Sequence, residues 1–416
     1  MLNLSVSPEY VDAKALELVP RLKDQGYSAE SLGQRREWIE LKTGCRLDHV
    51  GALSISSEEM RGNIENPIGA AQMPLGIAGP LRIDGTHAQG VFYVPLATTE
   101  GALVRSYERG MAALTRAGGV TTRVHLDENR VAPIFFFDDL ADASDFAQRL
   151  PEDFEAIRTA AEATTRHGKL LRLQCHPIGR QVIVNFSYRT VDAQGMNMIV
   201  KATEQACQWI VDHRQARGYY MFSGFSSEKR ASGSLLVGGK GKYVTAGALL
   251  PKAIVKSYLH TTPAKLCDMW QQTVLGHLQA NAIGYNGHYA NGLAAIFIAC
   301  GQDVANIANS AVGITNFEVT EGGDLYASVT LPSLTVATVG GGTALGTSRE
   351  CLEILSCVGS GHAAKFAEII AGTILAGELS MGSAIASKEF VQAHETLGRN
   401  RPSPCEPPIS IIHCSI

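Results

Sequence analysis

The stretch Asp192-Ala193-Gln194-Gly195-Met196-Asn197-Met198-Ile199-Val200-Lys201-Ala202-Thr203-Glu204 joins a tight polar turn to an apolar run with helical spacing. The turn contains Asp192, Gly195 and Asn197, and it can present backbone N–H groups and a helix N-terminus to an anion such as a cofactor phosphate. No Gly-x-Gly-x-x-Gly fingerprint follows a predicted strand anywhere in the chain. A nucleotide bound at this turn would therefore lie on a scaffold other than the Rossmann fold.

The residues around this turn have the pattern of a compact α/β unit. Short β-branched or aromatic runs predict strands, and longer runs with a 3.6-residue period predict helices. The order is strand Val131–Phe137, helix Asp145–Arg166 (broken near Pro151), strands Leu170–Cys175 and Gln181–Arg189, helix Met198–His213 and strand Tyr219–Phe222. This βαββαβ order is that of a ferredoxin-like split βαβ unit, which we expect to be inserted in a larger domain that resumes near residue 226.

Further elements are predicted on both sides of this unit. Before it we expect helices over Asp12–Leu22 and Ala29–Thr43 with Gly26 and Gly44 as stops, irregular structure and strands over 61–94, and a helix over 98–117. After it we expect strands Leu235–Val237, Lys242–Leu250 and Leu325–Thr330, and helices Pro263–Ala280, Gly292–Cys300, Ser348–Leu355 and His362–Leu397, the last broken near Gly382.

The bulk composition is that of a well-packed globular protein. Of 416 residues, 45% are hydrophobic and 18% are charged, which argues against disorder. The formal net charge of −4 argues against nucleic acid as a partner. The nine cysteines form no Cys-x-x-Cys pair, so we expect no disulfide framework, no metal site and a cytoplasmic location. We expect no membrane association, because the N-terminus lacks signal-peptide features and the longest apolar stretch, near 292–300, is too short to span a bilayer.

Three arginines fall on one face of the helix predicted at 98–117. At 100° per residue, Arg105, Arg109 and Arg116 lie within roughly 40° of one another. They form either a solvated basic face or a binding surface for a polyanionic ligand.

Four ionisable residues occur in unusual local settings. Glu100 follows two threonines at a predicted helix start, and Lys229 lies in the polar loop Ser-Ser-Glu-Lys-Arg. Asp303 follows an apolar helix, and His394 lies near the end of the last helix. Each also has a purely structural interpretation. Glu100 can complement a helix dipole, and Asp303 can cap the next helix. Lys229 and His394 can be solvated surface groups.

Seven motifs in one order carry a resemblance to a known enzyme family. They are Glu65-Asn66-Pro67-Ile68-Gly69, Gly76-Ile77-Ala78-Gly79-Pro80-Leu81, Ala97-Thr98-Thr99-Glu100-Gly101, Asp192-Ala193-Gln194-Gly195-Met196-Asn197, Gly284-Tyr285-Asn286-Gly287-His288, Gly301-Gln302-Asp303 and Thr338-Val339-Gly340-Gly341-Gly342-Thr343. From about residue 35 to 400, the chain resembles class I 3-hydroxy-3-methylglutaryl-coenzyme A (HMG-CoA) reductase without a membrane domain.

The resemblance implies a reaction and four catalytic residues. Two NADPH molecules, and no metal, would reduce an acyl-coenzyme A thioester to an alcohol through a bound aldehyde, most simply HMG-CoA to mevalonate. Lys229 would stabilise the oxyanion that hydride addition creates, and Glu100 would protonate that oxygen. Asp303 would link Lys229 and Glu100 in one network, and His394 would protonate the departing thiolate.

The resemblance also assigns binding residues. Its implied cofactor contacts are Thr165, Arg166, His167, Asp192, Gly195, Met196, Asn197, Gly341 and Gly342. An arginine at 166 favours NADPH over NADH, because a guanidinium can pair with the 2′-phosphate through two hydrogen bonds. Its implied contacts to the acyl-coenzyme A substrate are Ser106, Arg109, Ser223, Arg230, His288 and Asn291.

The implied fold class is α+β: a large α/β substrate domain with an inserted small ferredoxin-like (βαββαβ) cofactor domain and a helical N-terminal segment. The helical segment is expected at 1–60, the large substrate and dimerisation domain at 61–130 and 226–400, the small NADP-binding domain at 131–225, and an extended C-terminal tail at 401–416. The resemblance further implies a homodimer or dimer of dimers with active sites between subunits and the Glu65–Gly69 motif at the contact.

Departures from the family pattern concentrate around the acyl group. Phe136 stands about where the family has an arginine, and Gln272 replaces a lysine that binds the distal carboxylate. Arg105 replaces a small residue, and Glu389 replaces a histidine five residues before His394. Losing a charge-assisted hydrogen bond typically costs about 1.5–3 kcal/mol. Two alternatives to HMG-CoA reduction therefore stay open: the same chemistry on another acyl thioester, and a non-catalytic nucleotide-binding scaffold.

Overall fold

The computed structural model describes residues 18–22, 26–391 and 395, in two compact units that divide between Gln72 and Met73. The first unit is built around helix α1 (Ala29–Thr43) and a short 3-10 helix, η2 (Ser57–Met60). Ser28 caps the start of α1, and Gly44 ends it in the left-handed conformation that favours glycine. The expected helix at 29–43 is therefore confirmed. The helix expected over Asp12–Leu22 is wrong for 18–22, which are irregular, and its other residues lie outside the described chain.

A buried arginine organises the first unit. The guanidinium of Arg35, on α1, donates hydrogen bonds to the carbonyl oxygens of Pro20, Gly26 and Pro67. Three carbonyls can satisfy a buried guanidinium because it offers five N–H donors in a fixed plane. This explains why a charged residue occupies a fully buried position of α1.

The second unit contains a large mixed sheet. Its strand order is β2-β1-β3-β8-β10-β9, in which β1 and β3 are parallel and the other neighbours are antiparallel. The strands are β1 (Leu75–Gly85), β2 (Gln89–Ala97), β3 (Val120–Val131), β8 (Gly241–Leu250), β9 (Ile314–Val319) and β10 (Leu325–Leu334). Buried and less buried residues alternate along β8, because successive side chains point to opposite faces of a sheet.

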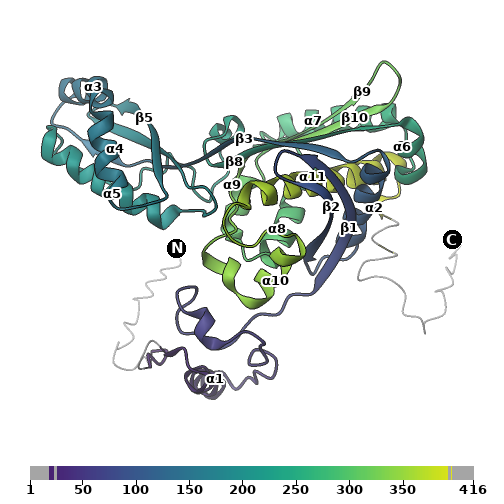
Figure 1. The fold of residues 1–416 in the computed structure, drawn as a ribbon, viewed down its shortest axis with the longest axis horizontal. Coiled ribbons are helices and arrows are strands. Elements are labelled where there is room, and N and C mark those ends of the chain that lie inside the picture. Colours follow the sequence, from purple (N-terminus) through teal and green to yellow (C-terminus); the bar gives the residue numbers. More distant parts are fainter. Residues whose placement is uncertain (1–17, 23–25, 392–394, 396–416) are drawn as a thin grey trace, which may run out of the picture. The chain divides into compact units, whose positions relative to one another are not determined.

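A smaller antiparallel sheet has the order β5-β6-β4-β7 and carries α3, α4 and α5 (Figure 1). Its elements are β4 (Ile134–Phe136), α3 (Leu140–Arg149), η3 (Leu150–Asp153), α4 (Phe154–Glu162), β5 (Lys169–Ile178), β6 (Gln181–Arg189), α5 (Met196–His213) and β7 (Gly218–Tyr220). The end of β3 pairs with β6, so one strand joins the two sheets. The smaller sheet has a hydrophobic core of its own.

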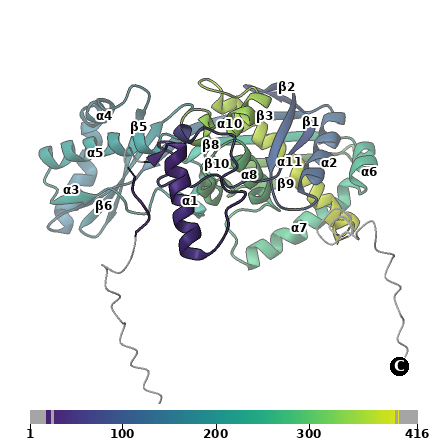
Figure 2. The same ribbon diagram turned by 90° about the horizontal axis from the view of Figure 1, so that it is seen from below.

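The core of the larger sheet is built on α11 (Ala363–Ser387), which contacts β3, β8, β10, α2 and α8 (Figures 1 and 2). Among the described residues, α11 alone is long and apolar enough to cross a membrane, but 83% of its most apolar window is buried inside the protein. It is therefore packed as a core helix. The other helices here are α2 (Leu103–Arg116), η4 (Gly233–Val237), α6 (Lys252–Leu259), α7 (Pro263–Gln279), α8 (Tyr289–Ala299), η5 (Val304–Asn306), α9 (Ile307–Ser310), η6 (Gly341–Ala344) and α10 (Gly346–Ile354).

Several expected elements differ from the observed ones. Of the strand expected at 131–137, only Ile134–Phe136 forms a strand of its own, β4, whereas Val131 ends β3, which was not expected over 120–130. Pro133, between the two strands, has no N–H for a continuous ladder. The strand expected at Leu235–Val237 is part of the 3-10 helix η4, where Ser232 Oγ accepts a hydrogen bond from the N–H of Ser234. α2 begins at Leu103 instead of 98, since Ala102 has a φ of 70° that a helix cannot accommodate. The break expected at Gly382 is wrong: α11 continues through it and ends at Ser387. β9 and α6 were not expected.

Candidate active site

Lys229 and Asp303 meet although they are 74 positions apart in the chain. Lys229 Nζ lies 2.8 Å from Asp303 Oδ2, and both side chains are partly exposed. Asp303 also caps η5, since its Oδ1 accepts a hydrogen bond from the N–H of Ala305. The hydrogen bond to Asp303 raises the pKa of Lys229 above its ordinary value. The pair therefore presents an ammonium group that keeps its proton at neutral pH.

Two further cations lie beside the Lys229 loop, and the sequence analysis did not find them. Lys240, the residue before β8, is fully buried and forms an ion pair with Glu228, the residue before Lys229. Burial lowers the pKa of Lys240, and the Glu228 carboxylate opposes that shift. The buried guanidinium of Arg130 donates to the carbonyl of Ser226. The sequence offered two signals, a lysine between two glycines and an arginine at the end of a strand. Lysine and arginine are rarely buried unless they are paired, so positions of this kind indicate a partner.

The predicted cofactor turn packs directly against the glycine-rich turn that follows β10. The N–H groups of Thr338 and Val339 donate to the carbonyl of Asp192, and Val339 pairs with Ala193 as an isolated parallel bridge. Gly195 caps α5 with a φ of 73°. Built Cβ atoms at Gly340 and Gly341 would meet nothing within 4 Å. The backbone of this second turn is therefore open to a ligand.

The glycine-rich turn at 340–342 also contacts the loop that carries Asp303. A Cβ at Gly301 would overlap the carbonyl of Gly342, and a Cβ at Gly342 would lie 2.7 Å from the carbonyl oxygen of Gly301. The two backbones thus approach too closely for any side chain. Asp192, Gly342 and Asp303 consequently belong to one continuous region that also holds Lys229. We call this region, with Arg130 and Lys240, the lysine half-site.

The Thr165–His167 loop lies near the start of α5. Thr165 Oγ1 accepts hydrogen bonds from the N–H groups of His167 and Gly168. A Cβ at Gly168 would lie 3.2 Å from the Met198 side chain, in the first turn of α5. Arg166 and His167 are exposed. The loop can therefore place the Arg166 guanidinium near the N-terminus of α5, where the sequence analysis expected a cofactor phosphate.

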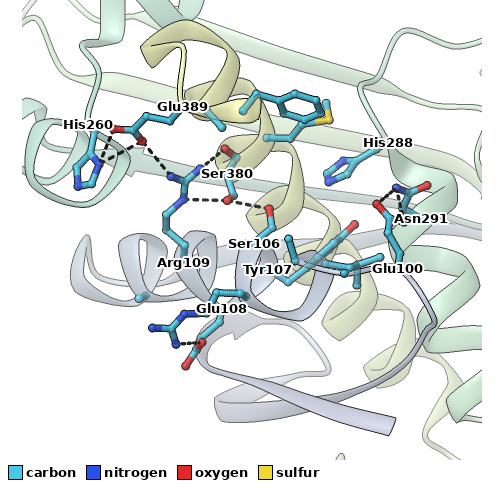
Figure 3. Close-up of a pocket in the computed structure, with 18 of the residues that line it drawn as sticks. Glu100, Ser106, Tyr107, Glu108, Arg109, His260, His288, Asn291, Ser380 and Glu389 are labelled. Carbon is cyan, nitrogen blue, oxygen red and sulfur yellow. Dashed lines mark hydrogen bonds and ion pairs between the residues drawn. The ribbon is translucent and has the colours of Figure 1, made fainter. Parts of the chain in front are cut away.

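A pocket of about 750 Å³ lies between α2, α8 and the C-terminal end of α11. Figure 3 shows Glu100, Asn291 and His288 at one end of it and Arg109, His260 and Glu389 at the other. Asn291 Nδ2 donates to both carboxylate oxygens of Glu100, at 3.2 and 3.0 Å. The amide thus orients the Glu100 carboxyl group at the pocket. We call this pocket the glutamate half-site.

Ser106 and Arg109 project from α2 toward α11. Ser106 Oγ and Arg109 Nε both donate to Ser380 Oγ at 3.0 Å. Glu389 lies 3.7 Å from Arg109 Nη1 and also contacts Nδ1 of His260, at 3.1 Å. Burial lowers the pKa of Arg109, and the Glu389 charge opposes that shift. Glu389 therefore balances two basic groups at this end of the pocket (Figure 3).

Within one chain, the two half-sites do not meet. Asn291 lies in the first turn of α8, whereas Asp303 follows its C-terminal end. A helix rises 1.5 Å per residue, so α8 holds the Glu100–Asn291 contact and the Lys229–Asp303 pair roughly 15 Å apart. Asp303 thus contacts Lys229 but does not link it to Glu100 within the chain. His394 lies outside the described residues, as does the tail at 401–416.

The remaining predicted acyl-site residues have other surroundings. Ser223 Oγ donates to the carbonyl of Ala132 at 2.6 Å, and the guanidinium of Arg230 lies over the Phe222 ring. Phe136 belongs to the smaller sheet, where it packs edge-on against Tyr220. Gln272 is exposed on α7.

Comparisons with known proteins identify the family of the chain. Residues 31–399 match the family described as hydroxymethylglutaryl-coenzyme A reductase. The chain is 44% identical over 375 residues to the 3-hydroxy-3-methylglutaryl-coenzyme A reductase of Methanocaldococcus jannaschii, covering 88% of this chain and 92% of that one. It is also 44% identical to the enzyme of the same name from Methanothermobacter thermautotrophicus, covering 89% and 94%.

Solved structures share the fold. The class II enzyme of Streptococcus pneumoniae, bound to NADPH in open conformations, superposes with a TM-score of 0.65 at 20% identity and covers 87% of this chain and 99% of its own. The fold and these relatives define an oxidoreductase that acts as a reductase. The chain belongs to the hydroxymethylglutaryl-coenzyme A reductase family, because the family pattern and relatives at 44% identity span most of its length. The expected family is confirmed.

Proposed function

We propose that this protein reduces HMG-CoA to mevalonate with NADPH. The observation that carries the proposal is the 2.8 Å contact between Lys229 and Asp303, because the family resemblance pairs these two residues and the fold joins them across 74 positions. The bound cofactor supplies the hydride. An ammonium held in its charged form stabilises the oxyanion that forms on the thioester carbonyl, a charge absent from the ground state.

The lysine half-site has the features that NADPH requires. The N-terminus of α5 and the open backbone at Gly340 and Gly341 suit a pyrophosphate and a flat ring. Exposed Arg166 suits the 2′-phosphate. The βαββαβ order and the β5-β6-β4-β7 sheet support a ferredoxin-like cofactor domain at 131–225. The contact between the Asp303 loop and Gly342 supports a hydride donor beside Lys229.

We propose that two copies of the chain complete each active site. One copy would contribute the lysine half-site, and the other would contribute Glu100, Asn291 and His394. Their separation along α8 within one chain supports this arrangement, since a proton donor must come within hydrogen-bond reach of the oxygen it protonates. The protein would therefore act as a homodimer or a dimer of dimers, with His394 protonating the departing thiolate.

The acyl site retains a cation in spite of the substitution at 136. The buried guanidinium of Arg130 lies beside the loop that carries Lys229 and Arg230. This supports HMG-CoA as the substrate over another acyl thioester, because Arg130 can pair with a carboxylate. Gln272 leaves one cationic position unfilled, so the alternative substrate class stays under test.

Class I membership rests on the seven sequence motifs. A cytoplasmic location is supported by the unpaired state of the cysteines that the structure describes.

Complementation between two inactive variants tests the proposal. Lys229→Ala and Glu100→Gln are each expected to abolish NADPH oxidation with HMG-CoA. Mixed and reassembled in equal amounts, they should recover about a quarter of the wild-type rate, because half of the dimers are mixed and each mixed dimer has one intact site. No recovery despite proven subunit exchange would refute the shared site.

Two simpler outcomes separate the alternatives. A panel of acyl-coenzyme A thioesters, assayed with the wild-type protein, identifies the substrate class. Faster turnover of another thioester would make that compound, and not HMG-CoA, the proposed substrate. Lys229→Ala with unchanged function in cells would instead support the non-catalytic scaffold.

A further inference from the structure

A buried carboxylate lies directly behind the imidazole at the end of the pocket. Glu378, on α11, is 2% exposed, and His288, at the start of α8, is 13% exposed. His288 Nδ1 lies 3.0 Å from Glu378 Oε1. The same carboxylate accepts hydrogen bonds from the N–H groups of Gly287 and His288 and from Thr315 Oγ1, at 2.7, 2.8 and 2.7 Å.

These contacts determine which nitrogen of His288 carries hydrogen. Burial by itself would raise the pKa of Glu378, but the hydrogen bonds from His288, Gly287 and Thr315 outweigh burial and lower it. Each oxygen of this carboxylate already faces a backbone N–H, so the group is held as an ionised carboxylate that can only accept hydrogen bonds. Nδ1 of His288 must therefore be the donor, which leaves Nε2 as the ring nitrogen available to a ligand.

The ring plane is fixed as well as the tautomer. The His288 ring stacks on Tyr107, with centroids 5.5 Å apart and planes 26° apart. Tyr107 is fully buried between two helix glycines, since a Cβ at Gly292 or Gly377 would overlap its side chain. Figure 3 shows Tyr107 and His288 beside each other near Glu100.

We propose that Glu378 is a positioning residue of the reductase. By accepting the hydrogen of His288 Nδ1, it presents the lone pair of Nε2 to the pocket, where Nε2 accepts a hydrogen bond from an O–H or N–H group of the acyl-coenzyme A substrate. The inference rests on the proposed function, since it takes the pocket as the acyl-coenzyme A site. Sequence alone offered one signal, an acidic residue inside the apolar helix α11.

Glutamine cannot replace this carboxylate without rearrangement. The site offers two backbone N–H donors, a hydroxyl and an imidazole N–H. In either orientation, the NH₂ group of a glutamine at 378 would face one backbone N–H that cannot turn away. The tautomer of His288 is then no longer specified. Thr315→Val provides a matched control, because it removes one buried hydrogen bond from the same carboxylate without touching His288.

Steady-state kinetics give the first test. With Glu378→Gln, kcat/KM for HMG-CoA should fall about tenfold or more, while KM for NADPH stays within about twofold of wild type. Thr315→Val should lower the melting temperature but keep kcat/KM. Adding Glu378→Gln to His288→Gln should cause no further loss of kcat/KM, because both changes remove the same interaction. Equal losses in the control and in Glu378→Gln would reduce Glu378 to a structural role.

A second test needs no activity and no folded Glu378 variant. In protein with ¹⁵N-labelled histidine, the signals that vanish in His288→Gln identify that ring. The wild-type ring should show a protonated Nδ1 and, in its neutral form, an unprotonated Nε2. The opposite tautomer would overturn the inference even in an active enzyme. An inactive wild-type protein with the expected tautomer would instead refute the proposed function and leave the dyad in place.

Discussion

The carboxylate of Asp192 caps the helix that begins at Ala363. Its two oxygens accept hydrogen bonds from the N–H groups of Gly361 and Ala363, at 2.8 and 3.1 Å. The N–H groups at a helix start have no partner within the helix and carry a partial positive charge, so a carboxylate there is stabilising. The residue that opens the predicted cofactor turn is thus tied to the core helix α11, which leads to Ser380 and the pocket.

Asp192→Ala should therefore affect both stability and cofactor binding. The lost cap should lower the free energy of unfolding by about 0.5–2 kcal/mol, and KM for NADPH should rise. Asp192→Asn keeps one of the two acceptor oxygens and should therefore lose less stability than Asp192→Ala. Urea denaturation and steady-state kinetics measure the two effects. A fully stable Asp192→Ala variant would show that the cap contributes little.

The ion pair of Lys240 and Glu228 should make single substitutions harmful and a paired one tolerable. Lys240→Met leaves the Glu228 carboxylate in a largely buried position without its partner, which should cost about 3–5 kcal/mol. Replacing both residues with methionine should restore most of the stability, because it removes both desolvation penalties. Denaturant unfolding of the three variants provides the measurement. A double variant as unstable as Lys240→Met would contradict this account.

Two helix glycines should respond to alanine in opposite directions. A Cβ at Gly110, on α2, would overlap the carbonyl oxygen of Ala376 on α11, so Gly110→Ala should destabilise the protein by about 1–3 kcal/mol or more. A Cβ at Gly276, on α7, would meet nothing within 4 Å. Gly276→Ala should stabilise by about 0.5–1 kcal/mol. Thermal unfolding of both variants checks the sign of each change.

Arg166 should determine the preference between NADPH and NADH. Arg166→Ala removes a charge-assisted hydrogen bond to the 2′-phosphate, a loss of about 1.5–3 kcal/mol. That loss corresponds to roughly a 10- to 150-fold fall in kcat/KM for NADPH, with NADH little changed. Arg158→Ala is the control. Arg158 also precedes β5 in the sequence, but it is paired with Glu155 and Glu162. If Arg166→Ala lowered kcat/KM equally for NADPH and NADH, Arg166 would not be the residue that binds the 2′-phosphate.

Glu378 should make the protein sensitive to acid. Its pKa in the folded state lies below the ordinary value of 4.5, because hydrogen bonds, led by that of His288, outweigh burial. A carboxylate with a lowered folded-state pKa contributes stability above its unfolded pKa, and that contribution is lost as pH falls through the folded-state value. The free energy of unfolding of wild type should therefore fall more steeply below about pH 4.5 than that of Glu378→Gln. Parallel curves would show that folding does not lower the pKa of Glu378.

Much of the fold was predictable because local patterns decide it. The helix at 29–43 is marked by Ser28 and Gly44, and the strand at 181–189 is an apolar run with turn residues before it. Where local signals misled, backbone geometry was responsible. Ala102 takes a left-handed conformation that its residue type does not announce, and the residues at 235–237 form a 3-10 turn in spite of their apolar character.

The sequence by itself determined the family, most of the element types and the residue types at the candidate active site, because motifs and periodicity are local properties of the chain. Only the tertiary structure decided which of those residues meet. Lys229 reaches Asp303, Asp192 caps α11, and Glu378 reaches His288 across 90 positions. Such contacts depend on how strands and helices pack in three dimensions. α8 keeps Glu100 away from Lys229 within one chain for the same reason: the rise of a helix sets a distance that spacing in sequence does not reveal.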